Sequence, residues 1–106
     1  MRNGKEIDEK GNIWVYKDDK LHCEDGPAII RINGHKQYYV NGVLHRVGGP
    51  AIEYQNGTKC WLIDGSLHRE DGPARIYSNG QKEWWIEGQL ITEQEFITRR
   101  IQNFLK

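Results

Sequence analysis

The chain has 106 residues, of which 37% are hydrophobic and 28% are charged, and its 15 basic residues balance its 15 acidic ones. Balanced charge excludes a strong overall attraction for nucleic acid or for an anionic membrane. No run of roughly 18 apolar residues could span a bilayer, and residues 1–12 hold no apolar signal core. We therefore expect a single domain over residues 1–106, a cytoplasmic location, and neither nucleic acid nor a membrane as partner.

Residues 1–10 are polar and are expected to form a lead-in. The chain then becomes repetitive: the octapeptide LHCEDGPA at residues 21–28 returns as LHRVGGPA at 44–51 and as LHREDGPA at 67–74. The three histidines have a constant spacing, since 45 − 22 and 68 − 45 both equal 23. A fixed period of this size predicts a stack of copied supersecondary units, here over residues 11–90.

Each unit holds two β-rich runs and two turn signals. In the first complete unit, residues 28–32 precede Asn33-Gly34, and residues 35–40 precede Asn41-Gly42. Asn-Gly between β-rich runs is typical of a hairpin with a type I′ turn. The fold class expected is therefore mainly β: a single-layer antiparallel meander of repeated β-hairpins, with about seven short strands in all.

The octapeptide is expected to be the return loop between units. Pro27, Pro50 and Pro73 suit the first residue of a strand, because proline lacks an amide donor. The histidines His22, His45 and His68 are expected to give a ring nitrogen to a backbone carbonyl in the loop. In this interpretation, the three histidines stabilise the loop and bind no ligand.

A metal site is the competing interpretation of these histidines, because His-x-x-Asp occurs at His22/Asp25 and at His68/Asp71. The middle copy has Gly48 in place of the aspartate. Histidines of neighbouring units would also lie ~10 Å apart, which is too far to share one ion. We therefore expect neither a metal nor another cofactor.

The two cysteines lie outside the repeated pattern, since Cys23 aligns with arginine in the other copies and Cys60 aligns with Gln37 and Glu83. A disulfide framework would be periodic or paired. Reduced thiols in a cytosol are the better interpretation.

The pattern NGxKxWxxxGxLHREDGPA resembles the tandem repeats of small phage and giant-virus proteins, which are grouped loosely with the MORN-repeat variants. The resemblance covers Gly11 to Leu90. It implies an elongated sheet of β-hairpins and a role in intermolecular contacts, with no catalytic residues. Ordinary MORN repeats lack the octapeptide loop, so no lipid role is carried over.

A helix is expected over residues 91–106, after the repeat ends. Thr92 and Glu95 form a capping-box pattern, with Thr92 as N-cap. One face carries the apolar residues Phe96, Ile97, Ile101, Phe104 and Leu105. The helix could cover the end of the stack or bind a partner, and both roles stay open.

Aromatic residues in the second run of each unit are the candidate binding residues. Successive side chains of a strand face opposite ways, which predicts two rows on opposite faces. One row is Tyr38, Trp61 and Trp84, and the other is Tyr39, Leu62 and Trp85. Either both rows are packed or one forms an exposed contact surface. The candidates are Tyr38, Tyr39, Trp61, Trp84 and Trp85.

The leading functional hypothesis is a non-enzymatic interaction module, as in a viral accessory protein that binds and inhibits a host defence factor. A host protein is the expected partner, and an open amino-terminal sheet edge, guarded only by Asp18, Asp19 and Lys20, suggests a homo-oligomer.

The alternative is a sponge for a nucleotide signal, in which tryptophans stack on a base and Lys59, Lys82, Arg69 or Arg75 neutralise phosphate. An enzyme is not expected, because catalysis needs a unique constellation of side chains, whereas the polar residues here recur with the period.

Overall fold

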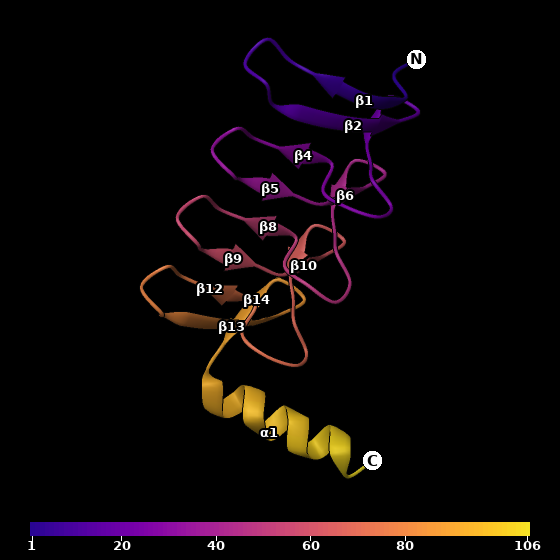
Figure 1. Ribbon diagram of the computed structural model, residues 1–106. Coiled ribbons are helices and arrows are strands. Elements are labelled where there is room, and N and C mark those ends of the chain that lie inside the picture. Colours follow the sequence, from indigo (N-terminus) through magenta and orange to yellow (C-terminus); the bar gives the residue numbers. More distant parts are fainter.

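The computed structural model describes residues 1–106 and is elongated, with extents of 50 × 31 × 19 Å (Figure 1). It contains fourteen β-strands and one α-helix, α1 (Glu93–Phe104). The strands are β1 (Gly4–Ile7), β2 (Ile13–Lys17), β3 (Lys20–Leu21), β4 (Ile29–Ile30), β5 (Lys36–Gln37), β6 (Tyr39–Val40), β7 (Val43–Leu44), β8 (Ile52–Glu53), β9 (Lys59–Cys60), β10 (Leu62–Ile63), β11 (Ser66–Leu67), β12 (Arg75–Ile76), β13 (Lys82–Ile86) and β14 (Gln89–Ile91).

Four hairpins, β1–β2, β4–β5, β8–β9 and β12–β13, stack in chain order into one antiparallel sheet, and each pairs with the next (Figure 1). Two separate two-stranded ladders, β6–β7 and β10–β11, lie beside this main sheet, and at its ends β3 and β14 join it by pairing with β2 and β13. The expected fold class, a mainly β antiparallel meander of hairpins followed by a carboxy-terminal helix, is confirmed.

The number of strands exceeds the expected seven for two reasons: the second run of the two middle units changes partner in its middle, and short strands (β3, β7, β11 and β14) follow the second turns. Gln37 pairs with Ile29 and Ile52 in the main sheet, whereas Tyr39 pairs with Leu44 in the side ladder. Tyr38 stands between them: its amide donates to Ala51 O at 2.8 Å, and its carbonyl accepts from His45 N at 3.0 Å. One predicted strand therefore becomes two, and the chain passes from the sheet into the loop region.

The two turns of each unit have different geometries. At Asn41-Gly42 both residues have positive φ, 49° and 80°, as a type I′ turn requires. At Asn33-Gly34 only the glycine has positive φ, at 94°, and Asn33 Oδ1 accepts from the His35 amide at 3.0 Å. A type I′ turn needs positive φ at both of its central residues. The type I′ prediction was therefore wrong for the Asn33-Gly34 turn, where only Gly34 is left-handed.

The segment 1–10, expected as a lead-in, belongs to the repeat array. Its strand β1 pairs with β2, and Gly11, with φ 95°, stands 23 residues before Gly34 because 34 − 11 equals 23. In this first turn the carboxylate of Asp8 accepts from the Asn12 amide, as the Asn33 side chain accepts from the His35 amide in the next unit. Hydrogen bonds to this carboxylate, chiefly from the Asn12 side chain, lower the pKa of Asp8 from 3.8 to about 2. The sheet edge that the sequence leaves open at β2 is therefore covered, and β1 is the edge strand.

The buried core is small and follows the period. Ala28, Ala51 and Ala74 are fully buried, and the largest buried cluster joins Ala51, Ile52, Cys60 and Leu62, with Leu44 and Leu67 packed against it. Both cysteines are free, Cys60 in this cluster and Cys23 in a half-buried loop position. The helix is too short and too polar to span a bilayer.

Helix α1 begins as predicted, with Thr92 as N-cap accepting from the Glu95 amide at 3.1 Å. Phe96 is its one buried residue and lies against Trp84, with ring centroids 6.4 Å apart. The other residues of the predicted apolar face remain exposed: Ile97, Ile101, Phe104 and Leu105. The helix is held to the last unit by this aromatic anchor and to the third loop by Arg100, whose Nη1 donates to Glu70 O at 3.2 Å.

Candidate functional site

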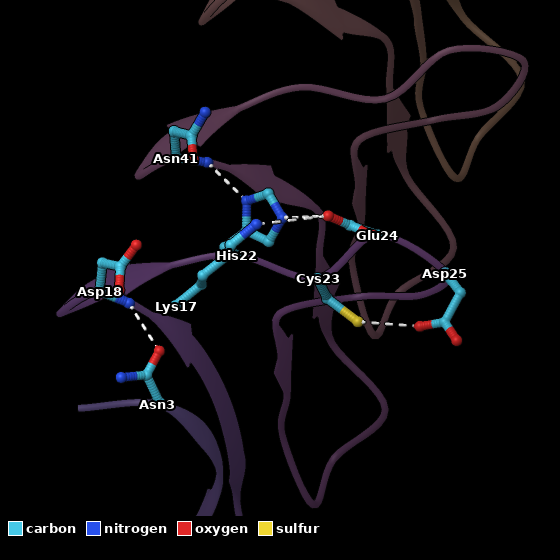
Figure 2. A network of polar contacts seen from close by, with 8 residues as sticks. All are labelled: Asn3, Lys17, Asp18, His22, Cys23, Glu24, Asp25 and Asn41. Atoms are coloured by element: carbon cyan, nitrogen blue, oxygen red, sulfur yellow. Dashed lines mark hydrogen bonds and ion pairs between the residues drawn. The ribbon is translucent and has the colours of Figure 1, made fainter.

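Each octapeptide loop is tied to the following unit by its histidine. The Nδ1 atom of His22 accepts from the Asn41 amide at 3.0 Å (Figure 2), that of His45 from the Asp64 amide at 2.9 Å, and that of His68 from the Glu87 amide at 2.9 Å. The prediction of a bond to a loop carbonyl was wrong in direction and partner. The ring accepts, so its proton lies on Nε2, and the donor is the first residue of the next type I′ turn.

The Nε2 side of the ring faces a carboxylate in the outer two loops. His22 Nε2 is 3.5 Å from Glu24 Oε1 (Figure 2), and His68 Nε2 is 3.5 Å from Glu70 Oε1. The middle loop has Val47 at this position. No group of three or more His, Cys, Asp and Glu side chains is arranged to hold a metal ion.

The guanidinium groups of two octapeptide arginines lie over aromatic rings of the preceding run. The guanidinium of Arg46 is 3.9 Å from the centroid of Tyr38, and that of Arg69 is 4.0 Å from the nearest ring centroid of Trp61. Their Nη1 atoms donate to the carbonyls of Pro50 and Pro73, at 3.0 and 3.1 Å. Such cation–π stacking fixes the side chain while one polar edge stays available.

This stacking explains the glycine that precedes each proline in the second and third loops. A Cβ atom at Gly72 would lie 2.8 Å from Arg69 Cζ, and one at Gly49 would lie 2.7 Å from Arg46 Cζ. Neither glycine has positive φ. Any side chain there would displace the guanidinium that crosses the backbone, so the glycine leaves room for the stacked arginine in these two loops.

Consecutive loops enclose two hollows that are equivalent under the repeat. The first, of about 640 Å³, lies between the first and second loops, and the second, of about 520 Å³, lies between the second and third. When 23 is added to the residue numbers that line the first hollow, nearly all of the resulting positions line the second hollow. The first is lined by Cys23, Glu24, Asp25, Gly26, Pro27, Tyr38, Val40, His45, Arg46 and Val47, and the second by Arg46, Val47, Gly48, Gly49, Trp61, Ile63, His68, Arg69, Glu70 and Asp71.

Val47 lines both hollows and is 80% exposed. The outer loops carry carboxylates on the two sides of it, Glu24 and Asp25 in the first and Glu70 and Asp71 in the third. Arg69 is 3.0 Å from Asp71 and, chiefly through this hydrogen bond, lowers the pKa of that carboxyl below its usual value. The loop face thus has an apolar tip between two acidic rims.

The five aromatic candidates are all half-buried. Tyr38 and Trp61 lie beneath arginines, and Trp84 lies against Phe96. Trp85 donates from Nε1 to Glu83 at 3.0 Å. Leu62, between Tyr39 and Trp85 in the second row, is in the core cluster. The exposed apolar residue between the hollows is instead Val47. The sequence could have indicated it, because the first and third octapeptides have Glu24 and Glu70 at the position where the middle one has Val47.

The residues of the nucleotide hypothesis do not meet in one place. The ring of Trp61 is covered by Arg69, and Arg75 is engaged by Glu83 at 3.1 Å and by Tyr77 at 3.3 Å. Lys59 and Lys82 flank Ile76 in the main sheet. Lys82 also lines a separate hollow with Trp84, where Glu83, Glu93 and Glu95 lie beside it. The tryptophans and cations of the hypothesis are therefore spread over different parts of the molecule.

No family model, no curated protein and no solved structure matches this chain. The class of protein is therefore defined by its own geometry, as a stack of four β-hairpins with a loop face along one side and a helix at the carboxy-terminal end (Figure 1).

Proposed function

We propose that this protein is a non-enzymatic interaction module that binds another protein through its loop face. The observation that carries the proposal is Val47, an apolar side chain 80% exposed at the rim shared by two hollows. Both neighbouring copies have glutamate at this position, so the unit itself does not require an apolar residue there. Val40 lines the first hollow with Val47 and Ile63 lines the second, so Val47 is one of several apolar side chains on this face; larger exposed apolar patches mark contact surfaces.

The exposed groups of the loop face indicate which surface on a partner would fit it. An apolar patch on the partner would cover Val47, and basic residues around it would face Asp25 and Glu70, because Glu24 is paired with Lys17 at 3.6 Å and Asp71 with Arg69 at 3.0 Å. The resemblance to phage and giant-virus repeats makes a host protein in the cytoplasm the proposed partner, with inhibition of that protein as the outcome. Free cysteines suit a reducing compartment.

Val47→Glu tests this proposal, because it installs the residue that the first and third loops carry at the same position. The fold should survive, since the outer loops accommodate glutamate beside the same histidine. Capture of a stoichiometric protein partner from host lysate should be lost. Ile32→Glu is the matched control, since Ile32 is 70% exposed in the β4–β5 turn and lines neither hollow.

Equal capture by wild type, Ile32→Glu and Val47→Glu would overturn the assignment of the loop face. A protein that captures no partner, but releases a small molecule on heating, would favour the nucleotide alternative instead. Melting temperatures of the variants show whether a loss of capture arises from unfolding.

A further inference from the structure

The three octapeptide loops differ in whether an arginine and an aspartate occur together. In the third loop Arg69 Nε donates to Asp71 Oδ1 at 3.0 Å. The middle loop keeps the arginine, Arg46, but has Gly48 in place of the aspartate. The first loop keeps the aspartate, Asp25, but lacks the arginine. The two members of the ion pair in the third loop are thus divided between the other two loops.

Arg46 is held in place without a carboxylate partner. Its guanidinium lies over Tyr38, 3.9 Å from the ring centroid, and its Nη1 donates to Pro50 O at 3.0 Å. None of the ion pairs of the chain includes Arg46, although it lines both hollows. Its Nε therefore lacks the acceptor that Asp71 provides for Arg69. A guanidinium fixed in this way loses little conformational freedom when it binds an acceptor.

Two carboxylates on either side of Arg46 also lack a basic partner. Asp25 lines the first hollow and accepts from Cys23 Sγ at 3.3 Å (Figure 2). Glu70 lines the second hollow, where its carboxylate is 3.5 Å from His68 Nε2. The other carboxylates of the two hollows are already paired with lysine or arginine. The loop face therefore carries a carboxylate, a guanidinium and a second carboxylate in order along the stack, and none of them pairs with an arginine, a lysine or a carboxylate.

The spacing of these three charges follows from the stack. Each unit adds two strands to the main sheet, and because neighbouring strands lie about 4.8 Å apart, consecutive loops lie about 10 Å apart. A polyproline-II segment has about three residues per turn and advances about 9 Å per turn, so its residues i, i+3 and i+6 share one side. Tyr38 and Trp61 line the two hollows, and polyproline-II segments bind to aromatic-lined grooves.

We propose that the loop face binds a polyproline-II segment of a partner protein with the pattern basic-x-x-acidic-x-x-basic. The acidic side chain accepts from Arg46 in the way that Asp71 accepts from Arg69, and the two basic side chains pair with Asp25 and Glu70. This recognition rests on the proposed function, because it names what the same loop face binds. A free anion such as inorganic phosphate fits less well, since it brings no cation for the two carboxylates.

Isothermal titration of the full chain with the peptide acetyl-Lys-Pro-Pro-Asp-Pro-Pro-Lys-amide tests the charge pattern. The wild type should bind this peptide at low salt. A peptide with asparagine in place of the aspartate should bind at least about tenfold more weakly, because it loses the charge-assisted bond to Arg46. The peptide acetyl-Asp-Pro-Pro-Lys-Pro-Pro-Asp-amide should not bind, because each of its charges meets a like charge.

Two variants test whether Arg46 holds the acidic side chain. Arg46→Gln should bind the aspartate peptide weakly and should no longer distinguish it from the asparagine peptide. Gly48→Asp installs the aspartate of the third loop and should weaken binding while the arginine is kept. Aspartate is among the residues that tolerate the positive φ of Gly48, 85°. Arg31→Gln is the matched control and should bind normally, since Arg31 is also stacked on an aromatic ring, Trp14, but lines neither hollow.

Three results would overturn this recognition. They are a wild type that binds neither peptide or both equally, an Arg31→Gln protein that loses as much affinity as Arg46→Gln, and inorganic phosphate that binds as tightly as the aspartate peptide. Each differs from a failure of the proposed function, because capture of a protein from host lysate is measured separately with Val47→Glu. Melting temperatures of the variants separate a loss of binding from unfolding.

Discussion

The histidines of the octapeptides act between units rather than within a loop. Each ring accepts one amide hydrogen bond from a residue 19 positions further on, since 41 − 22, 64 − 45 and 87 − 68 all equal 19. The acceptor atom sits in one loop and the donor in the next turn. A single side chain thus sets both the shape of its loop and the distance to the following hairpin, which explains why histidine recurs with the period.

His22→Ala should lower the free energy of unfolding by about 1–3 kcal/mol, because it leaves the Asn41 amide without its acceptor in a partly buried place. His68→Ala should cost less, since its bond to Glu87 is exposed. Urea unfolding of both variants measures the difference.

His22→Asn is the control, because an asparagine oxygen can take the place of Nδ1 and should recover part of the loss. A His22→Ala protein as stable as the parent would contradict the structural role of the ring.

At the scale of elements, the return loop works because three parts fit together: an aromatic ring at the end of one run, an arginine stacked on it, and a glycine that leaves room for the arginine. Tyr38, Arg46 and Gly49 form one such set, and Trp61, Arg69 and Gly72 form the next. The first loop has Cys23 in place of the arginine, and a Cβ at Gly26 would have only the Cys23 sulfur near it, at 3.9 Å. The glycine therefore leaves room for a neighbouring side chain only in the loops that carry the arginine.

Gly72→Ala should displace the guanidinium of Arg69 from Trp61 and from Pro73 O, at a cost of about 1 kcal/mol in unfolding free energy. Gly26→Ala, the matched change in the first loop, should be close to neutral. Chemical denaturation of the two variants gives the comparison.

In an Arg69→Ala background, Gly72→Ala should cost much less than it does in the wild type, because the side chain it displaces is gone. Equal costs in the two backgrounds would show that the arginine is not the reason for the glycine.

At the scale of the whole molecule, the array is a one-dimensional stack in which each hairpin contacts only its neighbours. Strand pairing passes from β2 to β4, from β5 to β8 and from β9 to β12, and the buried alanines recur with it. Stability in such a stack is close to a sum of unit and interface contributions. The number of units should therefore be variable, provided that whole periods are removed.

Excision of residues 38–60 removes one period, since 60 − 37 equals 23, and joins Gln37 directly to Trp61. The product should fold with the same far-UV spectrum and a lower melting temperature, because one interface is lost.

Excision of residues 38–59 leaves one extra residue in the joined run. That residue turns every following side chain of the strand to the opposite face, so this product should not fold cooperatively. Two products of equal stability would contradict a strict repeat register.

The sequence alone determined the architecture of this protein, because a 23-residue period, paired turn residues and β-rich runs are local signals that act within one unit. It also determined the start of α1 at Thr92, since an N-cap is set by residues four positions apart at most. The strand β1 was missed because Lys10-Gly11 lacks the asparagine of the later turns, although Gly11 keeps the period.

Only the tertiary structure decided which side chains are exposed and which atoms pair between units. The expected aromatic row is covered because the chain folds back after its second turn and lays Arg46 on Tyr38 and Arg69 on Trp61. The partner of each histidine is set by stacking, through the turn of the following unit that is brought beside the loop. Exposure of Val47 and of the apolar residues of α1 follows from what neighbouring units leave uncovered, a property of the assembled surface that no single unit contains.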